Sequence, residues 1–267
     1  MKQVRSGDAD IVYEVRGSGP PIVLLHPFPA NHDLWQPSAT ALESRYQLIL
    51  PDLRGHGDSE IGEGPATMAK HAADLGRILD AEGIGRALCV GVSIGGYILF
   101  EFWRAYRGRV AALVLCNTKA AGESTESRAA RLQAAADVLE RGTEPFFESM
   151  VARVLGETTR RTRPDLVDGA FRMMRKMSPE DVALVQRGMA DRPDSIDTLK
   201  TINVPSLIVT GGEDGLTGVP EAEVIKRNIT GSDMMVVPRA GHYSPWEQPE
   251  AVGRILRQFA DRAAAGG

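Results

Sequence analysis

The sequence predicts an α/β protein whose sheet is mostly parallel. One observation behind this prediction is a set of short, uninterrupted apolar runs, which are typical of strands buried on both faces; the runs are residues 22–25, 48–50, 88–90, 113–115 and 207–209. A second observation is that segments with helical periodicity, residues 68–82 and 94–106, lie between successive runs. Because strand, helix and strand alternate, we expect right-handed crossovers and parallel strand pairs.

Two segments depart from this alternation. Residues 9–16 alternate between apolar and polar side chains, which predicts a half-exposed strand closed by a turn rich in Gly and Pro at 17–21. Between residues 118 and 199 no strand-like run occurs, and helical patterns cover 128–141, 146–155, 164–177 and 179–189. We therefore expect one core, residues 1–117 and 200–267, and an inserted helical cap, residues 118–199, over the ends of the strands.

Composition narrows the class of protein. A chain of 267 residues with 43% hydrophobic residues can bury a large core without a metal or a disulfide, and we expect neither a metal nor a cofactor. The net charge of -4 disfavours nucleic acid and anionic membranes as partners. Cys89 and Cys116 lie in apolar runs and are expected to be reduced packing residues.

Residues 1–8 lack the apolar core of a signal peptide, and no apolar run reaches the length of a membrane span. We therefore expect a cytoplasmic protein. The sequence leaves open whether it is a monomer or a homodimer.

Ser93 occupies the most informative position in the chain. It follows an apolar run, precedes a helical segment, and lies within Gly91-Val92-Ser93-Ile94-Gly95. A serine flanked by glycines at a tight junction between a strand and a helix presents its hydroxyl away from the backbone. The N–H of Ile94 would then lie at a helix N-terminus, where it can stabilise an oxyanion. The pattern therefore predicts acyl-transfer chemistry.

Such a serine needs a base and a carboxylate that orients the base. Downstream, two strand-like segments end in loops that carry Asp214 and His242. Because the carboxyl ends of parallel strands meet at one edge of a sheet, Ser93, Asp214 and His242 should converge there. Glu213 adjoins Asp214 and is the alternative carboxylate, although we favour Asp214.

The chain resembles the α/β-hydrolase superfamily over essentially its whole length. The resemblance rests on four motifs in the family's order, which are the Ser93 segment, His-Pro-Phe-Pro at 26–29, Asp-Leu-Arg-Gly-His-Gly-Asp-Ser at 52–59, and Gly241-His242. It implies an eight-stranded, mostly parallel sheet flanked by helices. Residues 26–29, 95–97 and 190–195 are similar to those of small bacterial carboxylesterases and 3-oxoadipate enol-lactonases.

The resemblance also implies roles for individual residues. Ser93 would attack the acyl carbon, His242 would accept and then return its proton, and Asp214 would hold the imidazole in the correct tautomer. The backbone N–H groups of Phe28 and Ile94 would bind the oxyanion. Many relatives have Gly directly after the loop histidine, but this chain has Pro at position 27, which removes one donor while Phe28 keeps its own.

Three functions remain under consideration. The first is a carboxylesterase that cleaves esters of small to medium acyl chains through an acyl-enzyme. The second is a lactonase such as 3-oxoadipate enol-lactonase, which would use the same residues. The third is a non-catalytic ligand-binding protein on the same fold, which the presence of all three catalytic residue types disfavours. Epoxide hydrolases and haloalkane dehalogenases of this fold carry Asp as the nucleophile, whereas this chain has Ser93.

The sequence also offers candidates for the substrate pocket. We expect bulky side chains near the motif loops and in the cap to line it, although each could equally pack the interior; they are Trp35, Phe146, Phe147, Met150 and Met174. The cluster Arg160-Arg161-Thr162-Arg163 is either a receptor for a substrate carboxylate or, as we favour, a solvated helix end. His26 and Asp52 are expected to hold loops, and three other histidines, His32, His56 and His71, to lie on the surface or in loops.

Overall fold

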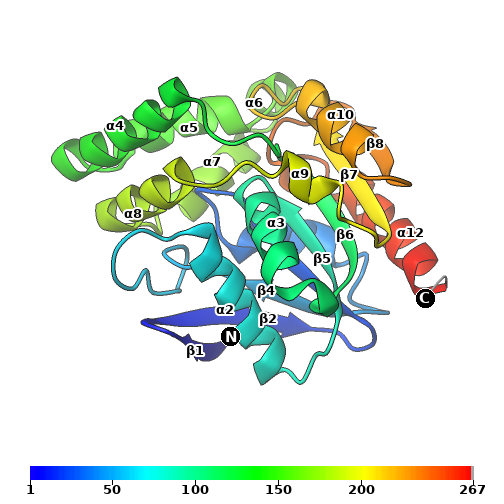
Figure 1. Cartoon of the computed structure of the whole chain (residues 1–267). Helices are drawn as coiled ribbons and strands as arrows, with labels where there is room; N and C mark the ends of the chain where they lie inside the picture. The colour runs from blue at the N-terminus through cyan, green and yellow to red at the C-terminus, as the bar shows by residue number, and fades with distance from the viewer. Residues whose placement is uncertain (266–267) are drawn as a thin grey trace.

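A computed structural model describes residues 1–265 (Figure 1), and within them the strands form one eight-stranded sheet in the order β1-β2-β4-β3-β5-β6-β7-β8. The strands are β1 (Lys2–Ser6), β2 (Ala9–Arg16), β3 (Pro21–Leu25), β4 (Gln47–Pro51), β5 (Ala87–Val92), β6 (Val110–Cys116), β7 (Ser206–Gly211) and β8 (Asp233–Val237). β2 runs antiparallel to both of its neighbours, and all other pairs are parallel. The predicted α/β class and mostly parallel sheet are confirmed.

The strand order fixes which helices cover which face. From β3 the chain crosses to β4 on one side, and every later crossover moves toward β8 on the other side. Right-handed crossovers in opposite directions place their helices on opposite faces. One face therefore carries α2 (Met68–Ala81), α3 (Ile94–Tyr106) and α10 (Val219–Asn228), and the other α1 (Gln36–Ala39). α1 packs with α11 (Ser244–Glu247) and α12 (Pro249–Ala265), while 3-10 turns occupy His32–Trp35 and Arg107–Arg109.

The direction reversal positions the functional loops. The ends of β3 and β5 are paired, with Leu25 opposite Gly91, so the loops that follow these two strands lie side by side. In open α/β sheets a crevice forms where the strand order reverses, outside the carboxyl ends of the strands. The loop after β3 and the Ser93 turn after β5 therefore meet at this crevice.

Residues 117–205, between β6 and β7, contain helices and no strand. The helices are α4 (Thr125–Arg141), α5 (Glu144–Val154), α6 (Glu157–Thr162), α7 (Pro164–Met174), α8 (Pro179–Ala190) and α9 (Ile196–Leu199). α4 and α8 lie against each other, and Figure 1 shows α4 to α8 beyond the carboxyl ends of the strands. α8 begins with a capping box in which Ser178 and Asp181 each satisfy a backbone N–H of the other.

The interior is built from the central strands. Every residue of β5 is buried, as are Cys89 and Cys116, which are both free thiols. Burial raises the pKa of each thiol to about 12, so neither ionises near neutrality. Within residues 1–265, no helix has both the length and the apolar character that crossing a bilayer requires.

Candidate active site

Ser93 lies at the sharp turn between β5 and α3. Its backbone has φ 55° and ψ -112°, a region that is unfavourable for any residue with a side chain. The turn is tight because β5 and α3 nearly touch. A Cβ atom at Gly91 would lie 2.4 Å from the backbone carbon of Gly95, so only glycine fits there. The strained turn leaves the Ser93 side chain partly exposed at the crevice.

His242 and Asp214 form a hydrogen-bonded pair on the neighbouring loops. The Nδ1 atom of His242 lies 2.9 Å from Oδ2 of Asp214, and the imidazole is almost completely buried. This contact leaves the Nε2 edge of the ring as the one that can exchange a proton with another group. Asp214 and His242 are thus arranged as a carboxylate that orients a base.

Several donors hold Asp214 in place. Its Oδ1 accepts the N–H groups of Leu216 and Thr217, and its Oδ2 accepts the Asn117 amide at 2.8 Å and the Thr217 hydroxyl at 3.0 Å. Burial alone would raise the pKa of Asp214, but the adjacent His242 and these hydrogen bonds hold it below its ordinary value. The carboxylate is therefore ionised and unable to rotate freely.

Glu213, the alternative carboxylate, points elsewhere. It accepts the backbone N–H of Thr158 at 2.8 Å and also the Thr158 hydroxyl, which joins it to α6. These contacts stabilise the charged form and lower the pKa of Glu213. The carboxylate that reaches His242 is that of Asp214.

The loop that carries His242 is also hydrogen-bonded to the end of α5 and to the residues that follow it. The Val154 carbonyl accepts the N–H groups of His242 at 2.9 Å and Tyr243 at 3.1 Å. The buried Glu247 carboxylate accepts the N–H groups of Gly156 at 2.8 Å and Gly241 at 2.9 Å. The two glycines face each other so closely that a Cβ at Gly241 would lie 2.3 Å from the Gly156 nitrogen.

Two backbone donors lie free at the crevice. Among residues 1–265, no acceptor binds the N–H of Phe28 or that of Ile94, the first residue of α3. His26 holds the Phe28 loop, because its Nε2 accepts the Leu53 N–H at 2.9 Å while its Nδ1 donates to the Pro27 carbonyl. Burial lowers the pKa of His26 to about 3, so the ring stays neutral. Free N–H groups beside a serine can stabilise a developing oxyanion.

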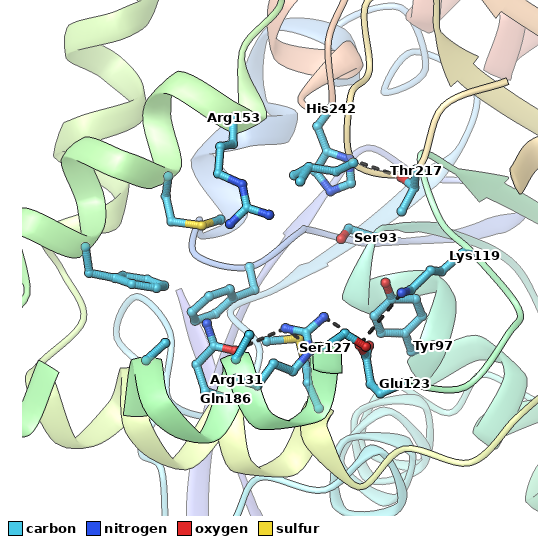
Figure 2. Close-up of a pocket in the computed structure, with 17 residues that line it drawn as sticks. Ser93, Tyr97, Lys119, Glu123, Ser127, Arg131, Arg153, Gln186, Thr217 and His242 are labelled. Carbon is cyan, nitrogen blue, oxygen red and sulfur yellow. Dashed lines mark hydrogen bonds and ion pairs between the residues drawn. The ribbon is translucent and has the colours of Figure 1, made fainter. Parts of the chain in front are cut away.

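These groups open into a cavity of about 250 Å³ (Figure 2). Ser93, His242 and Thr217 lie on its wall together with Phe28. The remaining wall comes from α3, from the loops after β6 and β7 and from helices between those strands. It is made of Tyr97, Lys119, Glu123, Ser127, Ala130, Arg131, Ala134, Phe146, Met150, Arg153, Gln186, Met189 and Leu216. The cavity is therefore apolar in part and carries several charged side chains.

On one side of the cavity, three cations surround a single carboxylate. The Glu123 carboxylate lies 3.1 Å from the Arg131 guanidinium, 2.9 Å from that of Arg192 and 3.7 Å from the Lys119 ammonium. Burial would raise the pKa of Glu123, but Arg131 and these neighbours hold it at about 2. Arg192 also stacks on the Tyr97 ring, with 4.0 Å to the ring centre.

Comparison with known proteins agrees with this arrangement. A family model described as the alpha/beta hydrolase fold matches residues 20–249. The chain belongs to the α/β-hydrolase family. A thermophilic esterase from Thermogutta terrifontis, whose structure was determined with malate bound, is 34% identical with a TM-score of 0.95, and the match covers 98% of this chain and 99% of that one.

Two further relatives of this α/β hydrolase are enol-lactonases. The 3-oxoadipate enol-lactonase 1 of Acinetobacter baylyi is 27% identical over 242 residues, which are 91% of this chain and 89% of that protein. The enol-lactonase of Burkholderia xenovorans LB400 is 22% identical with a TM-score of 0.91, over 97% of this chain and 100% of that chain. At that identity the second likeness shows the fold alone. The comparisons together indicate a hydrolase.

The expected pocket residues of this hydrolase divide into two groups. Phe146 and Met150 line the cavity, as expected. The expectation is wrong for Trp35, Phe147 and Met174, which are fully buried and do not reach the cavity wall. Successive helical residues point about 100° apart, so Phe147 packs inside while its neighbour faces the cavity.

The cavity cations of the hydrolase were not among the sequence candidates. No arginine of the expected cluster lines the cavity, and Arg163 of that cluster pairs with Asp165. The arginines that do line the cavity are Arg131 and Arg153. Helical spacing carried the missing signal for Arg153, because it follows Phe146 and Met150 by seven and three residues on α5 and so shares their face.

The three histidines expected at the surface or in loops are all buried in the hydrolase, although His56 does lie in a loop. His32 donates from Nδ1 to Asp52 at 2.7 Å; burial lowers its pKa, but the bond and charge of Asp52 outweigh that effect and raise it. His56 and His71 are enclosed by the core, which lowers the pKa of His56 to about 4 and that of His71 well below its ordinary value. Asp52 also accepts the Asp58 N–H, so it ties down its own loop as expected.

Proposed function

We propose that this protein is a serine hydrolase that cleaves carboxylic esters through an acyl-enzyme. The observation that carries the proposal is the shared cavity of Ser93 and His242, with Asp214 hydrogen-bonded to the far side of the imidazole. Ser93 is held in a strained turn and lines this cavity. A nucleophile, a base and an orienting carboxylate in chain order Ser, Asp, His match the needs of acyl transfer.

Each residue has one role in the proposed reaction. His242 removes the Ser93 proton as Oγ attacks the acyl carbon, and it returns that proton to the departing alkoxide. Water then attacks the acyl-enzyme with His242 again acting as the base, which releases the acid and restores Ser93. The N–H groups of Phe28 and Ile94 stabilise the negative oxygen of each tetrahedral intermediate.

We further propose that residues 118–199 act as a cap over this chemistry. Cavity-lining residues on α4, α5 and α8 support the proposal, because they enclose the space above Ser93. Phe146 and Met150 on α5 offer an apolar surface to an acyl chain, and the cavity volume favours small to medium chains over long ones.

A lactonase is the second candidate. The Acinetobacter baylyi enol-lactonase that this chain resembles over 91% of its length favours it. A lactone is an ester whose alcohol stays tethered, so the same residues would open the ring. The two candidates differ in substrate and not in the roles of Ser93, Asp214 and His242.

The experiment that tests the proposal has two parts. Initial rates are measured on p-nitrophenyl acetate, butyrate, octanoate and palmitate beside an enol-lactone, and a fluorophosphonate probe is used to label the activated serine. We expect Ser93→Ala or His242→Ala to lower kcat by roughly 10⁴-fold or more, since the residues act as a unit. Ser93→Ala should also abolish labelling.

Ser127→Ala is the matched control, because Ser127 lies on the same cavity wall but far from any imidazole hydrogen bond. It should retain labelling and turnover. Labelling that persists in Ser93→Ala, or wild-type protein that is folded but neither labelled nor active, would contradict the proposal and favour a ligand-binding protein. A strong preference for the lactone would select the second candidate.

A further inference from the structure

Arg153 is the cavity cation that lacks a counter-charge. It lies in the last turn of α5, and Figure 2 shows its guanidinium reaching into the space beside Ser93 and His242. Within the part of the chain that the structure describes, no carboxylate lies within ion-pair distance of it. The side chain is exposed to solvent in the cavity mouth and donates to no protein acceptor there.

The other cations of the cavity do not share this property. Lys119 and Arg131 both contact Glu123, and Arg131 also donates to the Gln186 side chain at 3.1 Å. In the view of Figure 2 this group lies on the opposite side of Ser93 from Arg153. Glu123 is the one carboxylate on the described cavity wall, and it is already engaged. Arg153 is therefore the cavity-lining cation that has no ion-pair partner at all among the described residues, whereas Lys119 and Arg131 share Glu123.

The backbone fixes Arg153 relative to the base. The next residue, Val154, accepts the N–H of His242 through its carbonyl at 2.9 Å. The Gly156 N–H is in turn held by Glu247, on the helical turn that follows His242. The backbone at Arg153 is thus attached to the same hydrogen-bonded unit as His242, which keeps the base of the Arg153 side chain near the imidazole.

We propose that Arg153 binds a carboxylate on the substrate, so that the preferred substrates are anionic esters or lactones. The inference rests on the proposed function, because it names the substrate class of the same site. A guanidinium offers paired N–H donors that match the two oxygens of a carboxylate. Arg153 acts on specificity and leaves the chemistry to Ser93 and His242. Its exposure to solvent sets the size of its effect, because water screens part of the attraction.

The test compares two substrates that differ in one charge, mono-4-nitrophenyl adipate and its methyl ester. We expect wild-type protein to prefer the anion in kcat/KM, and Arg153→Met to lower the ratio of the two values by about tenfold, chiefly through KM. Arg153→Lys keeps the positive charge but loses the paired N–H donors of the guanidinium. Its ratio should therefore lie between those of wild-type protein and Arg153→Met. In both variants kcat/KM on the methyl ester should fall by a smaller factor than kcat/KM on the anion.

Arg141→Met is the matched control, since Arg141 is an exposed arginine at the end of α4 that does not line the cavity. It removes the same net charge and should leave the ratio unchanged. A ratio that does not move in Arg153→Met, or that moves equally in Arg141→Met, would overturn the inference.

A binding measurement separates this inference from the proposed function. Calorimetric titration of Ser93→Ala with adipate should give a signal that the double variant Ser93→Ala/Arg153→Met has lost. If the methyl ester is hydrolysed without dependence on Ser93, the proposed function fails while this titration still tests Arg153. If hydrolysis depends on Ser93 and the titration is the same in both variants, only the role of Arg153 fails.

Discussion

At the scale of single residues, several groups donate hydrogen bonds to one carboxylate, that of Asp214. Asp214 accepts from Asn117, Leu216 and Thr217 besides its contact with His242. Asn117 itself has φ 43°, and Ser244 donates to its side-chain oxygen. The amide is thereby fixed with its nitrogen toward Asp214. The orientation of the imidazole thus depends on several residues besides Asp214, of which Asn117 does not line the cavity.

Thr217 offers a direct test of this dependence. Thr217→Val keeps the shape of the side chain but removes the hydroxyl that donates to Asp214 at 3.0 Å. We expect kcat/KM on p-nitrophenyl butyrate to fall by roughly three- to tenfold, the effect of losing one ordinary hydrogen bond while the other donors to Asp214 remain. Thr162→Val, on the exposed end of α6, is the control and should not change the rate. An unchanged rate in Thr217→Val would show that the remaining donors suffice.

At the scale of elements, the Ser93 turn depends on how closely β5 approaches α3. Gly91→Ala would place a Cβ 2.4 Å from the backbone carbon of Gly95, and backbone on both sides leaves no flexible atom to move. We expect the free energy of unfolding to fall by at least about 3 kcal/mol, in the range of other severe overpacking changes. Urea denaturation followed by circular dichroism measures it.

At Gly76 on α2 we expect alanine to increase stability instead. An added Cβ there would meet no atom closer than 3.7 Å, and alanine favours a helix over glycine. Gly76→Ala should therefore stabilise the protein by about 0.5 to 1 kcal/mol. If both substitutions changed the free energy of unfolding equally, the close contact between Gly91 and Gly95 would not be the reason that position 91 requires glycine.

Helices and strands with a clear hydrophobic pattern could be predicted from the sequence, and those without one could not. The buried strands and the helices α2 and α3 follow from apolar runs and helical spacing. β1 was missed because it is an exposed edge strand that contains Lys2, Gln3 and Arg5 and so lacks a run. α6 has six residues, too few for its periodicity to show. Arg131 on α4 was missed because its neighbours in sequence give no sign of which surface it faces until the helix is packed, whereas the spacing of Arg153 from Phe146 and Met150 did carry such a sign.

At the scale of the whole molecule, the order of the motifs predicted which three residues would converge, because the topology brings the strand ends together. Ser93, Asp214 and His242 are far apart in sequence and follow β5, β7 and β8. The three histidines could not be placed in this way. They lie in three different segments, a 3-10 turn, the loop after β4 and α2, and no local pattern shows that these segments bury them.

Buried neutral histidines make stability depend on pH. The pKa values of His26, at about 3, and His56, at about 4, lie below the ordinary value of 6.5, as does that of His71. Between about pH 4 and 6.5 the unfolded chain therefore binds protons that the folded protein does not. Stability should fall on acidification by about 1 kcal/mol per pH unit for each such histidine. His32, with its raised pKa, acts oppositely and loses its contribution as the pH rises above 6.5.

Two substitutions test this account by urea denaturation at several pH values. Both nitrogens of His71 lack a protein partner within residues 1–265, so His71→Leu should flatten the pH dependence without loss of stability at pH 7. His56 donates from Nδ1 to the Arg54 carbonyl at 3.0 Å, so His56→Leu should flatten the dependence and also lower stability at pH 7. A wild-type pH dependence in His71→Leu would refute the assignment.

The hydrogen bonds between Val154 and the His242 loop also define which parts of the chain can be exchanged between relatives. A chimera that took residues 118–199 from another hydrolase would bring a foreign partner to His242, Tyr243 and Glu247. The facing glycines, Gly156 and Gly241, would tolerate no side chain on either side of the junction. The exchangeable unit is therefore the cap together with residues 241–247, and recombination libraries that transfer the two as one block should retain folded, correctly aligned sites.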